Sequence, residues 1–258
     1  MKLVRAVAVP GRSATADSAV TELGRGRVRE STVTAVTEEL EATVDALAAR
    51  VLDRAGGCAG RYLLGIAGPP GAGKSTLAAA LRMAVDAAAG SSIAELAPMD
   101  GYHLPNARLR ALGRLAGKGE PDTFDVTGFV DGLNRLRHTP IGEPIPWPTF
   151  DRATDEPTPG GIVVTHHRIV ITEGNYLLLD DGPWSKVRPL LNHCWYLTAD
   201  RHTRIERLLH RHLRGGRDDI AARAKVHDSD MANADLVEGT AKRADLVLRE
   251  RDSHYFID

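Results

Sequence analysis

Cysteine, aromatic residues and long apolar runs are all scarce in this sequence of 258 residues. Its two cysteines, Cys58 and Cys194, are too few for a disulfide framework and lack C-x-x-C spacing, which suits a reducing compartment. No apolar run approaches the roughly 18 residues of a membrane span. The short run at residues 6–9 is also less than the apolar core of a signal peptide. We therefore expect a cytoplasmic protein with no membrane partner.

A surplus of charge of either sign is also absent, because 33 basic and 34 acidic residues leave a formal net charge of -1. No global field draws such a chain to nucleic acid, and we expect no nucleic-acid partner. Apolar residues, by contrast, are plentiful and make up 43% of the chain. That share supports one substantial core, so we expect one main domain with at most a small appended element.

Residues 65–77, GIAGPPGAGKSTL, contain the P-loop pattern G-x-x-x-x-G-K-[ST]. An apolar run at residues 62–64 precedes the pattern as a buried strand would, and residues 76–85, free of glycine and proline, favour a helix after it. Glycines let successive backbone N–H groups approach a polyphosphate at a helix N-terminus. The alternative is a glycine-rich turn that binds nothing. The expected nucleotide-binding residues are Gly68, Pro69, Pro70, Gly71, Ala72, Gly73, Lys74, Ser75 and Thr76.

The remaining sequence predicts strands alternating with helices. We expect strands at residues 93–99, 168–172, 193–197 and 245–248, and helices at residues 31–54 and 126–136. Alternation of this kind predicts an α/β fold, a P-loop NTPase-type three-layer sandwich whose mostly parallel sheet has helices on both faces. Along the chain we expect a flexible N-terminal extension (1–30) and one P-loop domain (31–258) with a leading helix (31–54), a nucleotide-binding core (62–100), a long loop region (101–160) and an arginine-rich segment (200–218).

The segment 200–218 predicts a helix with a row of arginines on one face. Arg204, Arg207, Arg211 and Arg214 recur at spacings of three and four, opposite a set of apolar residues, and Gly215-Gly216 ends the helix. Like charges gathered on one side repel unless something pairs with them. The row therefore favours a polyanionic ligand over an ordinary solvated face.

With these motifs in order, residues 60–250 resemble the uridine kinase, bacterial-type pantothenate kinase and phosphoribulokinase group of P-loop kinases. The resemblance rests on six segments: GPPGAGKST (68–76), MDGYH (99–103), PDTFD (121–125), FDR (150–152), TEGNYLLL (172–179) and the arginine-rich stretch that ends in GRD (216–218). It implies an ATP- and Mg²⁺-dependent kinase whose partner is a small-molecule hydroxyl acceptor: a nucleoside, a sugar or a pantothenate-like compound. The domain 31–258 would then be a P-loop kinase domain, with acceptor-site loops at 101–160 and a lid at 200–218.

The resemblance also implies a role for individual residues. Asp100 would be the base for the acceptor hydroxyl, Lys74 would reach the β- and γ-phosphates, and Ser75 with Glu173 would hold Mg²⁺. Arg207 and Arg211 would neutralise charge on the transferring phosphoryl group. The acceptor-site positions implied by the resemblance are Tyr102, His103, Asp122, Asp125, Asp151 and Arg152.

Two other functions remain as alternatives: a nucleotide-binding regulator, and an NTP hydrolase without a small-molecule acceptor. The [NT]-K-x-D motif of GTPases and the LSGGQ-type signature of ABC proteins are both absent from the sequence, which disfavours a switch or a motor. The presence of Asp100 and the lid arginines disfavours an idle regulator. A homodimer stays an open alternative to a monomer.

Overall fold

The computed structural model describes residues 40–258, which belong to one compact unit. Its main sheet has seven strands in the order β1-β9-β8-β7-β2-β6-β3, and β4 and β5 form a separate hairpin. Neighbours from β8 to β3 run parallel, whereas β9 and β1 are added antiparallel at one edge. The strands are β1 (Leu40–Ala42), β2 (Tyr62–Ala67), β3 (Ala94–Leu96), β4 (Ile145–Asp151), β5 (Glu156–Val164), β6 (Ile169–Gly174), β7 (His193–Ala199), β8 (Leu246–Arg251) and β9 (His254–Ile257).

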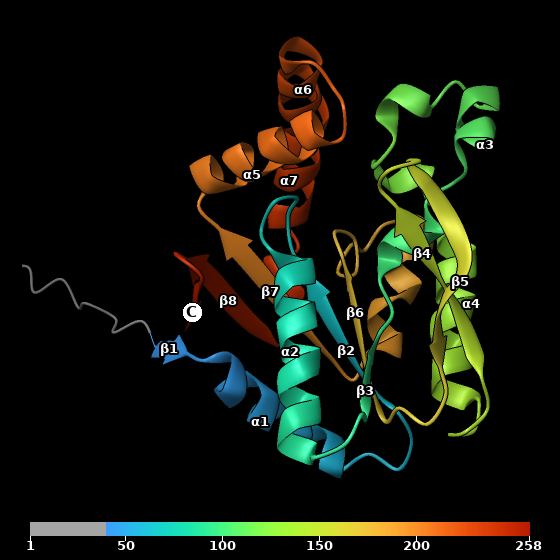
Figure 1. The fold of residues 1–258 in the computed structure, drawn as a ribbon, viewed down its shortest axis with the longest axis vertical. Coiled ribbons are helices and arrows are strands. Elements are labelled where there is room, and N and C mark those ends of the chain that lie inside the picture. The colour runs from blue at the N-terminus through green and yellow to red at the C-terminus, as the bar shows by residue number, and fades with distance from the viewer. Residues whose placement is uncertain (1–39) are drawn as a thin grey trace, which may run out of the picture. The chain divides into compact units, whose positions relative to one another are not determined.

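Seven α-helices surround these strands in the described part of the chain (Figure 1). They are α1 (Val44–Gly56), α2 (Lys74–Ala89), α3 (Asn106–Ala111), α4 (Val126–His138), α5 (Arg201–Arg214), α6 (Asp219–Lys225) and α7 (Met231–Glu238). A π-helical turn, Val226–Asp230, joins α6 to α7, and the short 3₁₀ turn Met99–Tyr102 follows β3. None of the helices in residues 40–258 has the length and apolarity needed to cross a bilayer.

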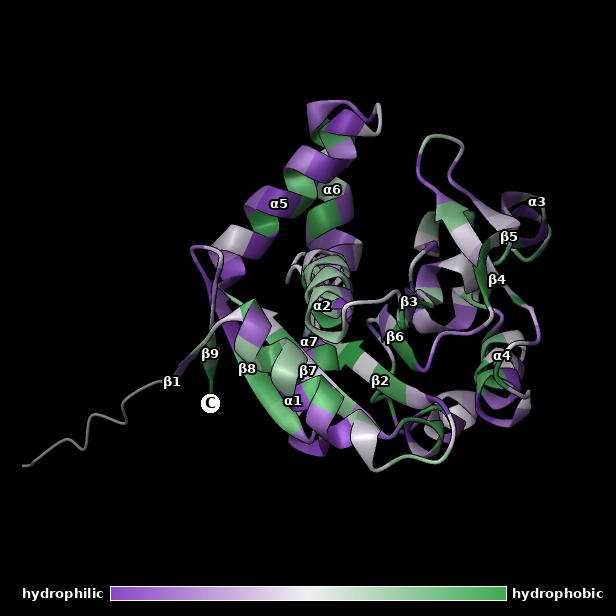
Figure 2. Cartoon of the chain, turned by 60° about the horizontal axis from the view of Figure 1, so that its bottom comes forward, coloured by the Kyte–Doolittle hydropathy of each residue, from purple (hydrophilic) through white to green (hydrophobic). Residues whose placement is uncertain are grey.

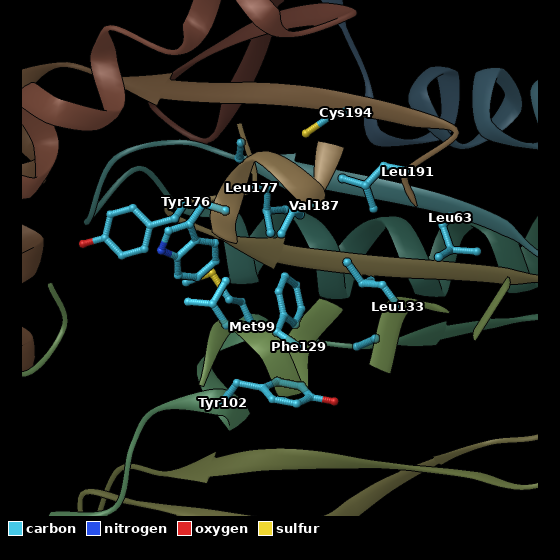
Figure 3. Close-up of a cluster of buried hydrophobic side chains, with 14 of the residues drawn as sticks. Leu63, Met99, Tyr102, Phe129, Leu133, Tyr176, Leu177, Val187, Leu191 and Cys194 are labelled. Carbon is cyan, nitrogen blue, oxygen red and sulfur yellow. The ribbon is translucent and has the colours of Figure 1, made fainter. Parts of the chain in front are cut away.

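Helices cover both faces of the parallel sheet, as expected for an α/β three-layer sandwich. Every residue of β2 and of β6 is buried, which is typical of central parallel strands. Successive side chains of a strand point to opposite faces, so Leu64 packs with α1 and α2 while Leu63 packs with α4 and α7. Figure 2 shows these strands as largely hydrophobic, and Figure 3 shows the aromatic core on the α4 side.

The helix predicted for residues 31–54 begins later than expected. Residues 31–39, and the predicted extension 1–30, lie outside the described residues. Leu40–Ala42 is not helical but pairs with β9 as an edge strand. Helix α1 begins at Val44, where the Thr43 side chain accepts a hydrogen bond from the Ala46 N–H at 3.1 Å. A local N-cap therefore sets the helix start, and apolar spacing alone did not reveal it.

The prediction for residues 101–160, loops interrupted by one helix, also needs correction, because this region contains strands. It holds the predicted helix as α4, but also most of the hairpin β4–β5, in which Ile145 pairs with Val164 and Asp151 with Glu156. Prolines at positions 146, 148, 157 and 159 concealed the hairpin, because proline disfavours central strands. A two-stranded hairpin outside the main sheet can accept them.

Strand boundaries differ by smaller amounts elsewhere. The strand predicted for residues 93–99 is only Ala94–Leu96, because Pro98 precedes a 3₁₀ turn that contains Asp100. The strands predicted for residues 168–172, 193–197 and 245–248 are present and extend a few residues further as β6, β7 and β8. Helix α5 corresponds to the helix predicted within residues 200–218. The chain then continues into α6 and α7. We call the whole stretch from Arg201 to Glu238 the lid segment.

Arg61 fastens the base of the hairpin to the main sheet. Its guanidinium is buried, and every acceptor that it has within the described residues is a backbone carbonyl oxygen. The shortest of these hydrogen bonds are 2.6 Å to Thr139 and 2.6 Å to Thr165. Burial lowers the pKa of Arg61 from its ordinary value. Because the acceptors come from the end of α4 and the end of β5, one cation fixes the hairpin against β2.

We predict that Arg61→Met destabilises the protein by about 3 kcal/mol, because several buried carbonyl groups lose their partner. Urea denaturation followed by circular dichroism measures this change. The matched control is Arg82→Met, which removes the i,i+4 pair of Arg82 with Asp86 on α2 and should cost no more than about 0.5 kcal/mol. Equal stability of the two variants would contradict the assigned role of Arg61.

Candidate active site

Three P-loop glycines have backbone conformations or close contacts that exclude a side chain. Gly68, at a φ of +150°, lies so near β7 that an added Cβ would be 2.0 Å from the Leu197 carbonyl oxygen. Gly71, at a φ of +78°, would place a Cβ 2.8 Å from the carbonyl oxygen of Arg204. Gly73, at a φ of +92°, is the N-cap of α2. The loop is thus seated against β7 and α5, with its amides at the start of α2.

Lys74 is the buried cation of this loop. Its side chain donates to the Pro69 carbonyl oxygen at 3.0 Å and to Asn175 Oδ1 at 2.7 Å. Burial lowers the pKa of Lys74 to about 8, although the carboxylates of Glu173 and Asp100 act in the opposite direction. The ammonium is therefore held by two neutral oxygens and by the field of two carboxylates, an arrangement into which a phosphate group fits.

Ser75 and Glu173 offer hard oxygen ligands beside Lys74. Ser75 Oγ donates to Glu173 Oε1 at 2.8 Å, and Glu173 ends β6 as a buried residue. Burial raises the pKa of the Glu173 carboxyl, and the neighbouring Asp100 carboxylate adds to the rise. Residues 40–258 contain no cluster of three or more His, Cys, Asp or Glu side chains that would form a complete metal cage. A hydroxyl and one or two carboxylates do suit Mg²⁺, which keeps waters and phosphate oxygens as its other ligands.

Asp100 faces the same space from the opposite side. It lies in the 3₁₀ turn after β3, and Arg152 of the hairpin donates to its Oδ2 at 3.1 Å. A cavity of about 220 Å³ lies between these residues and the oxygens of Ser75 and Glu173 that are predicted to bind metal. Its lining consists of Ser75, Ala78, Leu96, Pro98, Asp100, Thr149, Phe150, Arg152 and Glu173. The predicted base and the predicted metal ligands therefore share one cavity.

Among the predicted acceptor residues, Arg152 lines this cavity, and His103 contacts two of the lining residues, Asp100 and Phe150. His103 Nδ1 lies 2.7 Å from the Asp100 carbonyl oxygen, and its ring lies between Phe124 and Phe150, with centroid distances of 4.1 and 4.6 Å. Burial lowers the pKa of His103, which favours a neutral imidazole. His103 thus supports both the turn that carries Asp100 and the cavity wall at Phe150.

The structure places the other four predicted acceptor residues in local structural contacts. Tyr102 packs in the aromatic core with Phe129 (Figure 3). Asp122 accepts two hydrogen bonds from Arg114, and Asp125 caps α4 by accepting from the Gly128 N–H. Asp151 accepts from the Ala153 N–H and the Thr154 hydroxyl within the hairpin turn. None of these four lines the cavity between Asp100 and Glu173.

The arginines predicted to form one face of α5 divide into different environments. Arg204 is buried and pairs with Glu238 at 2.6 Å, so the expectation of a uniform ligand-facing row is wrong at this position. Arg207 pairs with the buried Glu250 at 2.8 Å and donates to the Gly71 carbonyl oxygen at 3.4 Å. These contacts brace the outside of the P-loop.

The Arg211 side chain forms neither a hydrogen bond nor an ion pair with any of residues 40–258. Partial desolvation lowers its pKa, which the carboxylates of Asp230, Asp100 and Glu173 oppose. Its guanidinium therefore lies within the field of the acidic groups around the cavity. Of the two arginines predicted to be catalytic, Arg211 is the one left available for an added anion.

Sequence reasoning missed several residues that shape the site. Asn175 holds the Lys74 ammonium, and its place directly after the Glu173-Gly174 strand end could have suggested it. Thr149 and Phe150 line the cavity, but their role depends on the hairpin, which was not foreseen. Glu250 belongs to the last parallel strand and is 43 positions from Arg207, so no local signal linked the two.

Comparison with known proteins establishes the family. No protein-family model matches the chain. A protein of Schizosaccharomyces pombe described as a candidate uridine kinase is 36% identical over 200 residues, 74% of this chain and 83% of its own. A pantothenate kinase of Leifsonia xyli is 28% identical over 224 residues, 75% of this chain and 67% of its own. The crystal structure of a candidate fructose transport system kinase from Silicibacter sp. is 38% identical, with a TM-score of 0.73, over 80% of this chain and 98% of that one.

The fold and the Lys74 loop define a protein of the P-loop NTPase class. Within that class, the chain belongs to the group that includes the uridine and pantothenate kinases, as the shared motifs and these similarities show. Membership implies use of ATP, for which Mg²⁺ is the typical metal, and a small-molecule phosphoryl acceptor.

We predict that nucleotide binding makes the protein take up protons at alkaline pH. In the free protein Lys74 loses its proton as the pH rises through about 8, and a triphosphate beside it restores the charged form. Uptake should be about half a proton per nucleotide at pH 8 but only about a tenth at pH 7. Titration calorimetry of Mg·ATP binding in buffers of different ionisation enthalpy measures the uptake. A binding heat that is independent of the buffer at pH 8 would contradict the assignment.

Proposed function

We propose that this protein transfers the γ-phosphoryl group of ATP to a hydroxyl group of a compact polyol, with a sugar as the leading acceptor class. The observation that carries the proposal is the cavity that Asp100 shares with Ser75 and Glu173. A hydroxyl placed there would have a carboxylate on one side and the terminal phosphate on the other. Phosphoryl transfer requires this positioning and little covalent chemistry from the protein.

Each charged group has a distinct task in the proposed reaction. Asp100 accepts the proton of the acceptor hydroxyl as its oxygen bonds to the γ-phosphorus and the bond to ADP breaks. Arg152 keeps the Asp100 carboxylate turned into the cavity. Lys74 and Arg211 balance the charge on the transferring group.

Mg²⁺, held through Ser75 and Glu173, would supply charge neutralisation and orientation of the phosphates. Arg207 supports the loop from outside, through its contact with the Gly71 carbonyl oxygen. Together, these groups surround both ends of the expected transfer path.

The size and lining of the cavity favour a small acceptor. Its volume of about 220 Å³ is below the roughly 300–1,000 Å³ typical of pockets for drug-sized ligands. Leu96, Pro98 and Phe150 provide apolar walls against which the carbon face of a sugar can lie. The name of the Silicibacter relative, a candidate fructose transport system kinase, supports a sugar, whereas those of the other two relatives support a nucleoside or pantothenate.

An acceptor screen tests the proposal directly. Purified protein with Mg·ATP is offered hexoses, pentoses, nucleosides and pantothenate, and ADP release is measured against a sample without acceptor. A kinase shows acceptor-dependent release, with sugars giving the largest increase. Release that no acceptor stimulates would instead favour the alternative of a hydrolase, and nucleotide binding without turnover would favour a regulator.

We predict that Asp100→Asn lowers kcat by about 10²–10⁴-fold with the best acceptor, the range typical of a general base. ATP affinity should change little, because the substitution is on the acceptor side of the cavity. Steady-state kinetics and equilibrium nucleotide binding measure the two effects. The matched control is Asp181→Asn at an exposed position, which should keep the normal kcat. A normal rate in Asp100→Asn would show that this carboxylate is not the base.

We further predict that Arg211→Ala lowers kcat by about 10²–10³-fold, as the loss of one donor to the transition state does. Its effect on the KM for ATP should be much smaller. Arg207→Ala should alter both constants, because it releases the P-loop carbonyl and Glu250. Arg201→Ala, which affects an exposed pair with Asp235, serves as the control. An Arg211→Ala enzyme impaired only in KM would show simple ground-state binding.

A further inference from the structure

Residues 114–123 form a segment, here called the bridging loop, that contacts both the lid segment and the hairpin. Lys225, at the end of α6, donates to the carbonyl oxygens of Lys118 at 2.8 Å and Ala116 at 3.3 Å. Lys225 also donates to Ser229 Oγ at 3.0 Å, so its ammonium is fixed within the lid segment. Asn233 of α7 contacts the next carbonyl oxygen, that of Gly119, at 3.4 Å.

The side chain of Lys118 extends from the bridging loop to the hairpin. Its ammonium donates to Asn106 Oδ1 at 2.7 Å, and to both the backbone and the side-chain oxygens of Asp155. Asp155 lies in the turn between β4 and β5, with a left-handed φ of +54° that aspartate adopts more readily than most residues other than glycine. Lys118 also lies over the Phe150 ring, 5.0 Å from its centroid.

The hairpin carries two walls of the proposed acceptor cavity, Phe150 and Arg152. Arg152 in turn pairs with Asp100. The lid segment carries Arg211, the arginine available to the phosphates. Within the bridging loop, Arg114 pairs with Glu120 at 2.5 Å and with Asp122 at 2.7 Å, which keeps the loop compact. Lys118 therefore contacts both segments. Its backbone carbonyl oxygen accepts a hydrogen bond from the lid segment, and its side-chain ammonium donates to the hairpin.

We propose that Lys225 is a positioning residue that sets the hairpin wall of the acceptor site through Lys118, and so links the lid to acceptor placement. The acceptor part of this statement rests on the proposed function, whereas the mechanical link from Lys225 to the hairpin does not. Within the described part of the chain, Lys225 forms no hydrogen bond or ion pair with Asp155 or Phe150, and its hydrogen bonds reach the hairpin only by way of the bridging loop. The Asp155 carboxylate acts on the Lys225 ammonium only as a more distant charge. Loss of the Lys225 ammonium should therefore loosen the turn between β4 and β5, although Lys225 does not contact that turn.

Amide hydrogen exchange in the turn peptide 151–156 tests the link in the full-length protein. Lys225→Met should speed exchange there by about fivefold or more, the lower end of typical coupling between sites. Lys118→Met should do the same. The double variant Lys118→Met/Lys225→Met should exchange no faster than Lys118→Met alone, because both substitutions break the same path. Lys225→Arg, which keeps a cationic donor, should restore most of the protection.

The matched control is Arg223→Met, which removes an exposed charge from α6 at a position two residues earlier. It should leave exchange in peptide 151–156 as it is in the wild type. Unchanged exchange in Lys225→Met would overturn the proposal. Additive effects in the double variant would do so as well, and so would an equal increase in Arg223→Met, since each would show a route other than Lys118.

A second measurement separates this link from the proposed function. With Mg²⁺ and the slowly hydrolysed analogue AMP-PNP, wild-type protein should show slower exchange both in the P-loop peptide 68–76 and in peptide 151–156. In Lys225→Met the P-loop should stay protected while the turn loses its response. If the P-loop of the wild type gains no protection, nucleotide binding is contradicted. The exchange rates of peptide 151–156 without nucleotide, compared between the wild type and Lys225→Met, would still test the link between Lys225 and the hairpin. A turn that responds equally in both proteins would overturn it.

Discussion

The buried ammonium of Lys74 is the constraint on which the rest of the site depends. A lysine can remain charged in the interior only where oxygen atoms surround it and opposite charge lies nearby. Here Pro69 and Asn175 provide the oxygen atoms, and Glu173 and Asp100 provide the charge. Because these residues belong to the P-loop, to the end of β6 and to the turn after β3, the ammonium fixes three neighbouring parts of the sheet edge relative to one another.

The same arrangement explains why the sheet had to be parallel in this region. The P-loop follows β2, Glu173 ends β6 and Asp100 follows β3, and these are adjacent strands whose carboxyl ends meet at one edge. Gly68 and Gly71 then allow the loop to pack against β7 and α5. Donor-side chemistry is thus built almost entirely from strand ends, with α5 as a supporting wall.

Prediction from sequence reproduced the strand, loop and helix around Lys74 but missed the hairpin beside Asp100, for a physical reason. A P-loop, its strand and its helix are contiguous, and residues 62–85 contained the whole signal. Asp122, Asp125 and Asp151 resembled acceptor residues in type and order, but their carboxylates satisfy Arg114, the N-terminus of α4 and a hairpin turn. Short polar side chains in turns often bond to nearby backbone, and spacing alone does not distinguish that use from ligand binding.

The proline-rich hairpin shows the limit most clearly, because its function depends on contacts remote in sequence. Its base is fixed by Arg61, its Arg152 meets Asp100 and its turn is held by Lys118. None of these partners is within thirty residues of the position it contacts in the hairpin, so no local pattern could reveal them. In the proposed reaction, acceptor choice therefore resides on an element outside the main sheet. Under this proposal the hairpin could change without disturbing the buried Lys74 site, which would fit similar chains whose names imply different acceptors.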